Sequence, residues 1–412
     1  MFELDEQTQM VARMVRQWCE TKLAPRIPAL ESGSEQPFEL MKQMAKTFGF
    51  DAMLGASVKK RIAKLRAGET PEPDGIARGV GNPPTGSGRS ELGTPMTMHV
   101  VVKELSRVSP GFAMGFGVSM GLVGGAIVAK GTPDQIERWG LPLATLQQIG
   151  SWCLTEPGAG SDAFGSMRTT ARAEAGGYVL KGSKTFITNG PGADVFLVYA
   201  KLGDGVATFI VERNTPGVTV GPPFKKMGMR DSPTSEVFFD DVRLGAEHLL
   251  PGGRSATKDS LGTERSGVPA MAWGIIERCY DASLAYVRER VQFGRPIGAF
   301  QAVQLKITDL FLKLRTVENV VYRTAWLQHK AIRDMPFVNA SKAMCAQLAV
   351  DAALTAIQIH GGYGYMEELG IEKLARDAKL LELGAGTTDI NLLAAARELI
   401  DGNRGGVSEI AT

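Results

Sequence analysis

The chain has 412 residues, of which 44% are hydrophobic and 22% are charged, and its formal net charge is +2. This length predicts about two or three domains, and the composition is that of an ordinary globular protein. The nearly balanced charge argues against nucleic acid as the main partner. Four widely separated cysteines, without a CxxC pair or a nearby His, indicate reduced thiols and no metal site. The acidic N-terminus lacks an apolar core, so we expect a cytoplasmic protein without a targeting signal.

The first 150 residues predict a helical domain. Residues 5–23 and 39–48 each place apolar side chains on one helical face, which in the first segment is formed by Val11, Met14, Val15 and Trp18. Between 57 and 95 a basic patch leads into a stretch rich in Gly, Pro and Thr, which predicts a long loop or insertion. The basic residues of that patch are Lys59, Lys60, Arg61, Lys64 and Arg66.

An uncharged stretch, 108–129, is long enough to cross a membrane. It contains six glycines and is followed at once by Lys130. We therefore predict a helix packed inside the protein and no membrane span. Thr132 and Pro133 are suited to the N-cap and the first turn of a further helix.

In residues 151–250 the hydrophobic period changes to two, which predicts an antiparallel β domain. The expected strands are 178–188, which ends in an Asn189–Gly190 turn, 195–201, 207–212 and 235–242. Residues 251–412 return to long amphipathic helices typical of a bundle, at 261–291, 301–333, 337–360 and 388–400. The chain is therefore expected to be an α+β protein. It has no strand–GxGxxG–helix unit, so a Rossmann nucleotide site is not supported.

The run Trp152–Asp162, WCLTEPGAGSD, begins as an apolar strand and breaks into a Pro/Gly turn. Such a strand can offer backbone amides and carbonyls to the edge of a flat polar ring, and the small residues after it let a ligand come close. Thr155 adds a hydroxyl group. Taken alone, a short run of this kind is more often a simple turn between strands.

Four further motifs follow in the order KTFITNG (184–190), RVQFG (290–294), QIHGGYGYM (358–366) and LELGAGTTD (381–389). The first also suits an ordinary strand entering a hairpin, and the second suits a helix that ends at a glycine with a favourable terminal cation. An arginine there would equally offer a planar fork of donors to a pyrophosphate. His360, in the third motif, has no acid or base partner in the sequence, which favours a structural role.

Together these motifs resemble the acyl-CoA dehydrogenases, over about residues 1–400. The resemblance implies an N-terminal α-helical domain, a middle β domain and a C-terminal four-helix bundle, with FAD bound between the last two and a neighbouring subunit. It implies that Phe186 lies against the isoalloxazine ring, that Thr188 lies near flavin N5, and that Arg290 reaches the adenine dinucleotide half. All the residues it implies in FAD binding are Trp152, Leu154, Thr155, Ser161, Phe186, Ile187, Thr188, Arg290, Phe293, Gln301, Gln358, Gly361, Gly362, Thr387 and Asp389.

This chain departs from the common family pattern at Ala385, where most members have the glutamate that removes the α-proton. Isovaleryl-CoA and long-chain acyl-CoA dehydrogenases have Gly-Ala-Gly-Thr here and supply the glutamate from an earlier helix. That position is Glu264 in this chain, so Glu264 is the expected base. The ordinary alternative is that Glu264 has no catalytic role and is a glutamate in the first turn of a helix, stabilised by the helix dipole. If Glu264 is not the base, Glu382 is the next candidate.

The implied reaction is α,β-dehydrogenation of an acyl-CoA to the trans-2-enoyl-CoA. Glu264 would take the α-proton, the flavin would take the β-hydride, and the amide of Ala385 would stabilise the thioester oxygen. Burial should raise the pKa of Glu264 toward neutrality. The expected substrate-binding residues are Ser161, Arg265, Ala385 and Gly386.

The resemblance also implies that electrons pass to an electron-transfer flavoprotein, and that the subunits form a homotetramer, a dimer of dimers. Two alternatives remain open. One is an oxidase or monooxygenase of the same fold, and the other is a non-catalytic flavoprotein that binds DNA, for which the basic patch is the sole indication.

Overall fold

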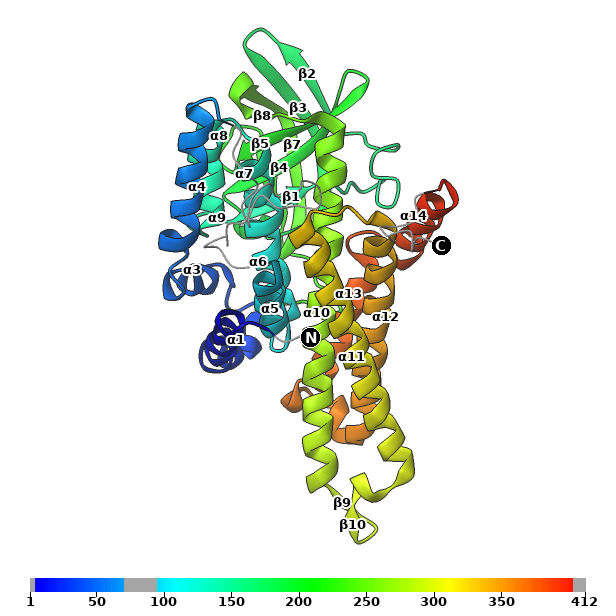
Figure 1. Ribbon diagram of the computed structural model, residues 1–412. Helices are drawn as coiled ribbons and strands as arrows, with labels where there is room; N and C mark the ends of the chain where they lie inside the picture. The colour runs from blue at the N-terminus through cyan, green and yellow to red at the C-terminus, as the bar shows by residue number, and fades with distance from the viewer. Residues whose placement is uncertain (1–3, 70–94, 403–412) are drawn as a thin grey trace, which may run out of the picture.

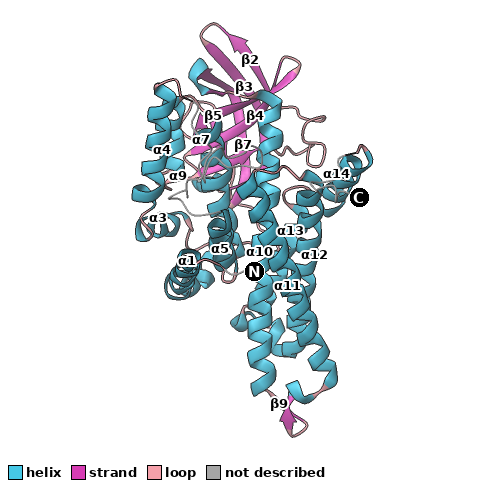
Figure 2. Ribbon diagram, viewed as in Figure 1, coloured by secondary structure: helices cyan, strands magenta, loops and turns pink. Residues whose placement is uncertain are grey.

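The computed structural model describes residues 4–69 and 95–402, and for 253–261 it describes the backbone only. Helices, then a sheet, then long helices follow one another along the chain (Figure 1). The sheet lies at one end of the molecule, and the C-terminal helices extend away from it (Figure 2). This order confirms the predicted fold class. Most of the predicted insertion, 70–94, lies outside the described residues.

The N-terminal part consists of helices that often join without a break. The α-helices are α1 (Glu6–Trp18), α2 (Ile27–Ser32), α3 (Phe38–Thr47), α4 (Phe50–Arg66), α5 (Pro95–Ser106), α6 (Pro110–Phe116), α7 (Gly125–Lys130), α8 (Pro133–Gln135) and α9 (Leu141–Ala144). They are linked by π-helical turns η1 (Cys19–Leu23), η3 (Gly117–Gly124) and η4 (Ile136–Gly140), and by the 3₁₀ turn η2 (Ala24–Arg26). The predicted N-cap at Thr132 is confirmed, since its side chain and that of Gln135 form a capping box.

Two details of this part differ from the sequence prediction. The sequence predicts a loop from residue 57, but α4 continues to Arg66 because Val58 and Ile62, four residues apart on one face, are both buried. The apolar face of α1 is narrower than predicted. Val15 and Trp18 are buried, whereas Met14, about 100° around the helix from Val15, is 46% exposed.

The uncharged stretch forms the continuous helical run α6–η3–α7. This run, and a second one at Met335–Tyr365, are long and apolar enough to cross a membrane by length and composition. In Pro110–Lys130, 72% of the most apolar window is buried inside the protein. The prediction of an internally packed helix at 108–129 is therefore confirmed.

The middle part is one sheet in the order β6-β7-β3-β2-β4-β5-β8, with β1 beside β4. Its strands are β1 (Gly150–Cys153), β2 (Thr170–Glu174), β3 (Gly177–Thr188), β4 (Val195–Leu202), β5 (Gly205–Glu212), β6 (Val218–Val220), β7 (Thr234–Gly245) and β8 (Leu249–Leu250). Pairing is antiparallel except that β1, and one residue pair of β2, run parallel to β4. The sheet is thus mixed rather than purely antiparallel.

Asn189 does not turn the chain into a hairpin, because β3 pairs with β2 and β7 and not with the strand that follows it. Its backbone is left-handed, with φ 65°. Its side-chain amide donates to the carbonyls of Gly115 (2.8 Å) and Gly150 (3.2 Å). This residue therefore connects α6 to the sheet.

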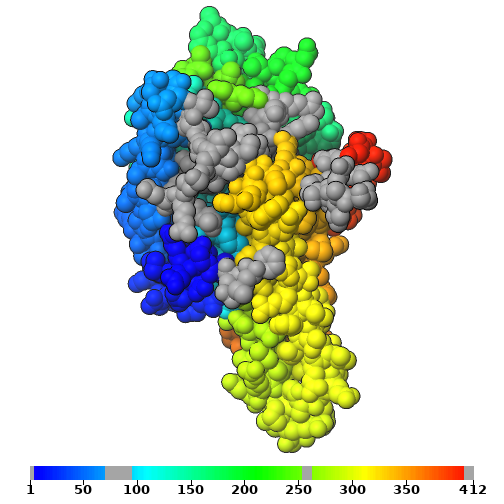
Figure 3. Space-filling model, viewed as in Figure 1, coloured from blue at the N-terminus to red at the C-terminus, as the bar shows by residue number. Residues whose placement is uncertain are grey.

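The C-terminal part consists of long helices with a two-stranded hairpin at its tip. Its elements are α10 (Gly253–Glu289), β9 (Val291–Gln292), β10 (Arg295–Pro296), α11 (Gln301–Lys330), α12 (Met335–His360), η8 (Gly361–Tyr365), α13 (Ile371–Leu383) and α14 (Thr388–Ile400). Helix α13 lies outside the predicted ranges. The space-filling view shows α11, in yellow, covering much of the narrow lower part of the molecule (Figure 3).

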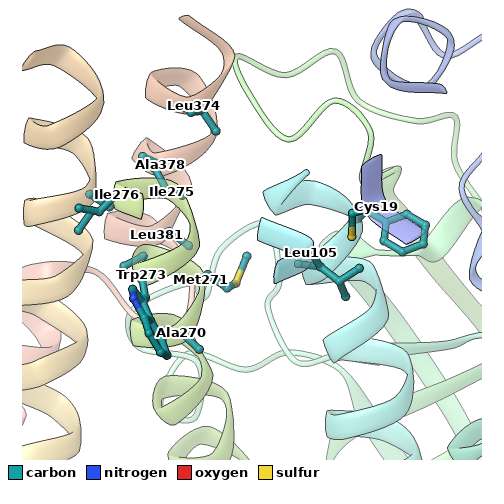
Figure 4. Packing of buried hydrophobic residues seen from close by; sticks show 14 of the residues in the cluster. Cys19, Leu105, Ala270, Met271, Trp273, Ile275, Ile276, Leu374, Ala378 and Leu381 are labelled. Atoms are coloured by element: carbon teal, nitrogen blue, oxygen red, sulfur yellow. The ribbon is translucent and has the colours of Figure 1, made fainter. Parts of the chain in front are cut away.

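The N- and C-terminal helices share one hydrophobic core. In Figure 4 Met271 of α10 points toward the helix that carries Leu105, α5, whereas Ile275 of α10 lies near Ala378 of α13. The sheet has a separate core on β3, β4, β5 and β7. Helix α10 is therefore held in place by helices from both ends of the chain.

The crossing of α10 and α5 depends on Gly274, because a Cβ there would lie 2.3 Å from the backbone oxygen of Lys103. We expect Gly274→Ala to lower the free energy of unfolding by about 1–3 kcal/mol through overpacking. The matched control is Gly267→Ala on the same helix, where no described atom beyond the adjacent backbone of α10 lies within 4 Å of the position that a Cβ would take. That change should stabilise the helix by up to about 1 kcal/mol. Thermal unfolding of the two variants checks this, and equal melting temperatures would contradict it.

Candidate active site

The loop after β1 is held by a buried ion pair. Lys184 of β3 is completely buried, and its Nζ donates to Glu156 Oε1 (2.8 Å) and to the Leu154 carbonyl (3.0 Å). The Glu156 carboxylate also accepts from two backbone amides, that of Arg168 at Oε2 (2.6 Å) and that of Thr169 at Oε1 (3.0 Å). Burial by itself would raise the pKa of Glu156, but these hydrogen bonds hold it below its ordinary value. The loop that begins with the first sequence motif therefore has a defined path.

On this loop and on the adjacent strands β1 and β3, some of the expected flavin-binding side chains are buried and others are exposed. Leu154 and Ile187 are buried, and Trp152 Nε1 donates to the Tyr199 hydroxyl (2.8 Å). These three expected flavin-binding residues can therefore offer mainly their backbone to a ligand. Thr155 and Ser161 are partly or fully exposed, and the Thr155 carbonyl accepts from the Thr185 amide (2.9 Å).

Phe186 has the most unusual backbone in this region. The pairing of β3 with β7 is irregular between Lys184 and Ile187, and Phe186 within that irregularity has φ 57°. Its ring is 69% exposed and lies 5.7 Å from the ring of Phe224. A left-handed conformation is costly for a bulky residue and is typical of functional positions. The bulge presents an aromatic side chain that the sheet's own packing does not require.

A second loop lies between α13 and α14. Ala385 (φ 55°) and Gly386 (φ 84°) are both left-handed. The Ala385 carbonyl accepts from Arg265 Nε (3.2 Å), and the Gly386 carbonyl accepts from Lys342 Nζ (2.6 Å). Asn391 Nδ2 lies within 3.3 Å of the carbonyl oxygens of Ala385, Gly386 and Thr387. We call residues 384–387, held in this way, the site turn.

The backbone amide of Ala385 is left available by this arrangement. Among the residues that the structure describes, no acceptor bonds it, although the neighbouring Gly384 amide donates to Leu380 (2.8 Å). Thr387 caps α14, since its hydroxyl accepts from the Ile390 amide (3.3 Å). Asp389 is exposed in the first turn of α14.

Glu264 lies on α10 beside Arg265, which contacts the site turn. Its Oε2 is buried and has no hydrogen-bond partner within the described part of the chain. Burial raises the pKa of Glu264 to about 7, against the opposing effect of the positive charges of Arg265 and Lys342. A carboxyl group of this pKa gains and loses a proton near neutral pH.

Glu382, the second candidate for the base, is engaged elsewhere. Its carboxylate pairs with Lys379, three residues earlier on α13. The structure thus provides a local partner for Glu382 and none for Oε2 of Glu264 among the residues it describes, which favours Glu264 as the proton acceptor.

Sequence reasoning missed three residues that shape the site turn: Asn339, Lys342 and Asn391. Asn339 Oδ1 accepts from Arg265 Nη1 (2.8 Å), and all three residues are at most 1% exposed. The one available signal was a lysine within the apolar stretch of 337–360. Asn339 and Asn391 carry no motif that distinguishes them from helix surface residues.

Thr188 ends β3, close in sequence to Phe186, whereas six of the expected FAD-binding residues lie at the opposite end of the bundle. Arg290 ends α10 and stacks over the Tyr363 ring (5.6 Å), and Phe293 in the hairpin is 93% exposed. Gln301, Gln358, Gly361 and Gly362 are also exposed to differing degrees. Arg290 is 26 residues beyond Glu264, or about 39 Å along a helix. The hairpin β9–β10 and the sheet are far apart in Figure 1, so one chain does not bring these residues to the site turn.

His360 and the basic patch have structural partners. His360 is buried, its Nδ1 bonds the Ala356 carbonyl (2.8 Å), and its ring stacks on Tyr286 (4.4 Å). In the patch, Arg61 donates to the carbonyls of Val128 and Ala129 at the end of α7. Arg66 pairs with the acidic residues Asp134 (3.0 Å) and Glu137 (2.7 Å). Two of the five basic side chains therefore hold α4 against its neighbours.

Models of the acyl-CoA dehydrogenase N-terminal, middle and C-terminal domains match residues 82–147, 151–242 and 252–400. A probable acyl-CoA dehydrogenase of Bacillus subtilis strain 168 is 34% identical over 411 residues, which cover 97% of this chain and 99% of that protein. The chain therefore belongs to the acyl-CoA dehydrogenase family. It is an oxidoreductase of that family and its cofactor is FAD.

Solved structures agree with this assignment. Butyryl-CoA dehydrogenase from Megasphaera elsdenii has a TM-score of 0.83 and 29% identity, with 97% of this chain and 100% of that chain covered. A chain in a structure described as the electron transferring flavoprotein of Acidaminococcus fermentans has a TM-score of 0.84 and 29% identity, with 97% and 99% covered.

The residues around β1 and β3 fit a flavin. Phe186 supplies an exposed aromatic face, and the backbone at Leu154 and Thr155 lies at the start of a loop of small residues. The Lys184–Glu156 pair fixes that loop before any ligand binds, which reduces the entropy lost on binding.

Removal of the Lys184 charge should disrupt this loop. We expect Lys184→Met to lower the free energy of unfolding by about 3–5 kcal/mol, because Glu156 would remain buried without its cation, and to lower the flavin bound per chain. The control is Lys181→Met on the same strand, whose side chain is 62% exposed and only pairs with Asp240 and Asp241. Thermal unfolding and flavin absorbance measure both effects. Full flavin content in Lys184→Met would argue against a role for the pair in cofactor binding.

Proposed function

We propose that this enzyme oxidises an acyl-CoA thioester to the trans-2-enoyl-CoA, with Glu264 as the base that removes the α-proton. The observation that carries the proposal is the buried Oε2 of Glu264, which is unpartnered among the described residues and belongs to a carboxyl group whose pKa is about 7. A carboxylate without a partner is free to accept a proton from a substrate carbon. Ala385, at the usual family position of the base, has no group that can do this.

The reaction breaks two C–H bonds and forms one C=C bond. The proton on Cα passes to Glu264 Oε2, and the electron pair of that bond becomes the new π bond. When bound, FAD would supply the acceptor for the β-hydrogen and its electron pair. Phe186 and Thr188 would hold the flavin ring, and the backbone of Leu154 and Thr155 would bind its polar edge.

Loss of the α-proton places negative charge on the thioester oxygen. The amide of Ala385 is suited to stabilise that oxygen, because a fixed donor needs no reorganisation as the charge develops. The alanine side chain takes no part in this, so the substitution at residue 385 leaves the donor in place. Gly386 allows a ligand to approach the turn closely.

Ser161 and Arg265, both expected to bind the substrate, differ in their surroundings. Ser161 is exposed in the loop after β1 and would bind the pantetheine arm of CoA. Arg265 bonds the Ala385 carbonyl through Nε and Asn339 through Nη1, which supports a role in holding the site turn beside its expected contact with the substrate.

The two separated groups of FAD-binding residues support an assembly of at least two chains. In this arrangement the sheet and site turn of one chain bind the flavin ring. Arg290, Phe293 and Gln301 of another chain bind the adenine dinucleotide half, with Gln358, Gly361 and Gly362 beside them. We propose a homotetramer built as a dimer of dimers, with reduced flavin passing electrons to an electron-transfer flavoprotein.

The alternative functions differ in how the reduced flavin is used. An oxidase or monooxygenase of this fold would react rapidly with dioxygen after reduction. A non-catalytic DNA-binding relative would need a basic surface, and the internal partners of Arg61 and Arg66 weaken that interpretation.

Glu264→Gln should slow flavin reduction by about 10²–10⁴-fold, because the amide cannot accept the α-proton. The measurement is anaerobic bleaching of the flavin band by acyl-CoAs of increasing length and branching, which also identifies the preferred substrates. The control, Glu382→Gln, should be bleached close to the wild-type rate. Rapid bleaching of Glu264→Gln would refute the assignment of the base.

The reaction should depend on pH through the same carboxyl group. The pKa of Glu264 is raised to about 7, and the active form is the carboxylate. The rate of flavin reduction should therefore be low at acidic pH, rise through about pH 7 and reach a plateau above it. Stopped-flow measurement of flavin reduction at a series of pH values records this rise in rate and its midpoint. If the rate instead rises around the ordinary pKa of a glutamate, Glu264 is not the base whose titration controls the rate.

A further inference from the structure

Lys342 is a buried cation at the proposed active site. It lies in the middle of α12 and is 0% exposed. In the described part of the chain its Nζ has one hydrogen-bond acceptor, the Gly386 carbonyl at 2.6 Å. The ammonium group therefore contacts the site turn directly.

Within the part of the chain that the structure describes, Lys342 lacks the close carboxylate partner that would offset the free-energy cost of burying its ammonium group. A buried ammonium group requires a close counter-charge or several hydrogen bonds to be stable. Among the described residues the contact of Nζ is with a neutral carbonyl, that of Gly386, and Lys342 takes part in no ion pair. Burial lowers the pKa of Lys342 to about 8, and the nearby negative charge of Glu264 opposes this effect. Such a group costs stability, which favours a functional reason for its presence.

We infer that Lys342 is a positioning residue for the proposed dehydrogenation, which holds the site turn through the Gly386 carbonyl and favours the ionised form of Glu264 through its charge. This inference rests on the proposed function. Its first part is a matter of geometry, because Ala385 and Gly386 both need a left-handed backbone that their surroundings must maintain. Its second part is electrostatic. Lys342 of α12 bonds the Gly386 carbonyl, and Arg265, next to Glu264 on α10, bonds the adjacent Ala385 carbonyl. Both helices therefore meet the same turn, where the charges of Lys342 and Glu264 act on each other.

Other charged groups act on the same pair. Arg265, on α10, lowers the pKa of Glu264 together with Lys342. Glu382 of α13 acts on Lys342, and Glu398 of α14 acts on Arg265. These charges remain when Lys342 is substituted. A change in the pH midpoint of flavin reduction can therefore be attributed to the loss of the Lys342 charge.

Three variants separate the two roles. Lys342→Arg keeps the charge, Lys342→Gln keeps an N–H donor without the charge, and Lys342→Met removes both. The measurement is the pH dependence of anaerobic flavin reduction by the best acyl-CoA, with the purified holoenzyme. Melting temperature and flavin content are recorded for every variant.

Loss of the positive charge should move the pH midpoint upward by about one unit in Lys342→Gln and Lys342→Met, which lowers the rate on the acidic limb about tenfold. The plateau rate at high pH should fall further in Lys342→Met than in Lys342→Gln, because methionine cannot hold the Gly386 carbonyl. Lys342→Arg should restore the wild-type midpoint.

A merely structural lysine would behave differently. Lys103→Met is the control, since Lys103 is also buried but pairs with Glu104 and Glu277 away from the site turn. It should lower the melting temperature without moving the midpoint. If Lys342→Met does not fold, the comparison of Lys342→Gln with Lys342→Arg still decides the charge effect.

Equal midpoints for wild type, Lys342→Gln and Lys342→Arg would overturn the inference. The proposed function fails separately: its base is wrong if Glu264→Gln is reduced by acyl-CoA close to the wild-type rate, and its reaction is wrong if no acyl-CoA bleaches the wild-type flavin. If Glu264→Gln is inactive and the Lys342 variants keep the wild-type pH midpoint, Glu264 remains the base and Lys342 does not favour its ionised form.

Discussion

The arrangement of the site depends on the rigidity of α10. This helix has 37 residues and is therefore about 55 Å long. It is packed between α5 and α13 in the shared core, with α11 and α12 alongside (Figure 4). One helix therefore carries Glu264 at the sheet end and Arg290 at the far end, at a fixed separation. The proposal that one FAD contacts both groups of residues therefore goes together with the proposal that the two groups come from different chains.

The effect of a buried lysine in this protein depends on its distance from the nearest carboxylate, as Lys184 and Lys342 show. Lys184 lies 2.8 Å from Glu156, so the two charges neutralise each other and fix the path of a loop. Lys342 bonds a carbonyl instead and remains apart from Glu264, so its charge is available to influence a proton transfer. A close pair holds Glu156 below its ordinary pKa, whereas burial keeps that of Glu264 near 7 despite two nearby cations.

The site turn is also held from the side of α13. Lys373 and Asp377 of that helix form a buried cluster with Asp231 from the loop before β7. Glu31 of α2 pairs with Arg376 and lies 3.5 Å from Lys373. Helix α13 is thereby tied to both preceding parts of the chain, and the turn that follows it inherits a defined position. Buried ionic clusters of this kind lose much stability when one member is removed.

The sequence by itself determined the order of helical and β parts, most helix and strand positions, and the motifs around Thr155, Phe186 and Ala385, because hydrophobic period and turn chemistry are local properties. The resemblance to the acyl-CoA dehydrogenases also predicted Glu264 as the base, because residue 385 is an alanine where most members have the glutamate. Only the tertiary structure decided that α4 extends to Arg66, that Arg265 turns to the Ala385 carbonyl, and that Lys342 and Asn391 hold the site turn. Those contacts join residues between 5 and 120 positions apart, and their burial arises only when α10, α12 and α14 pack together.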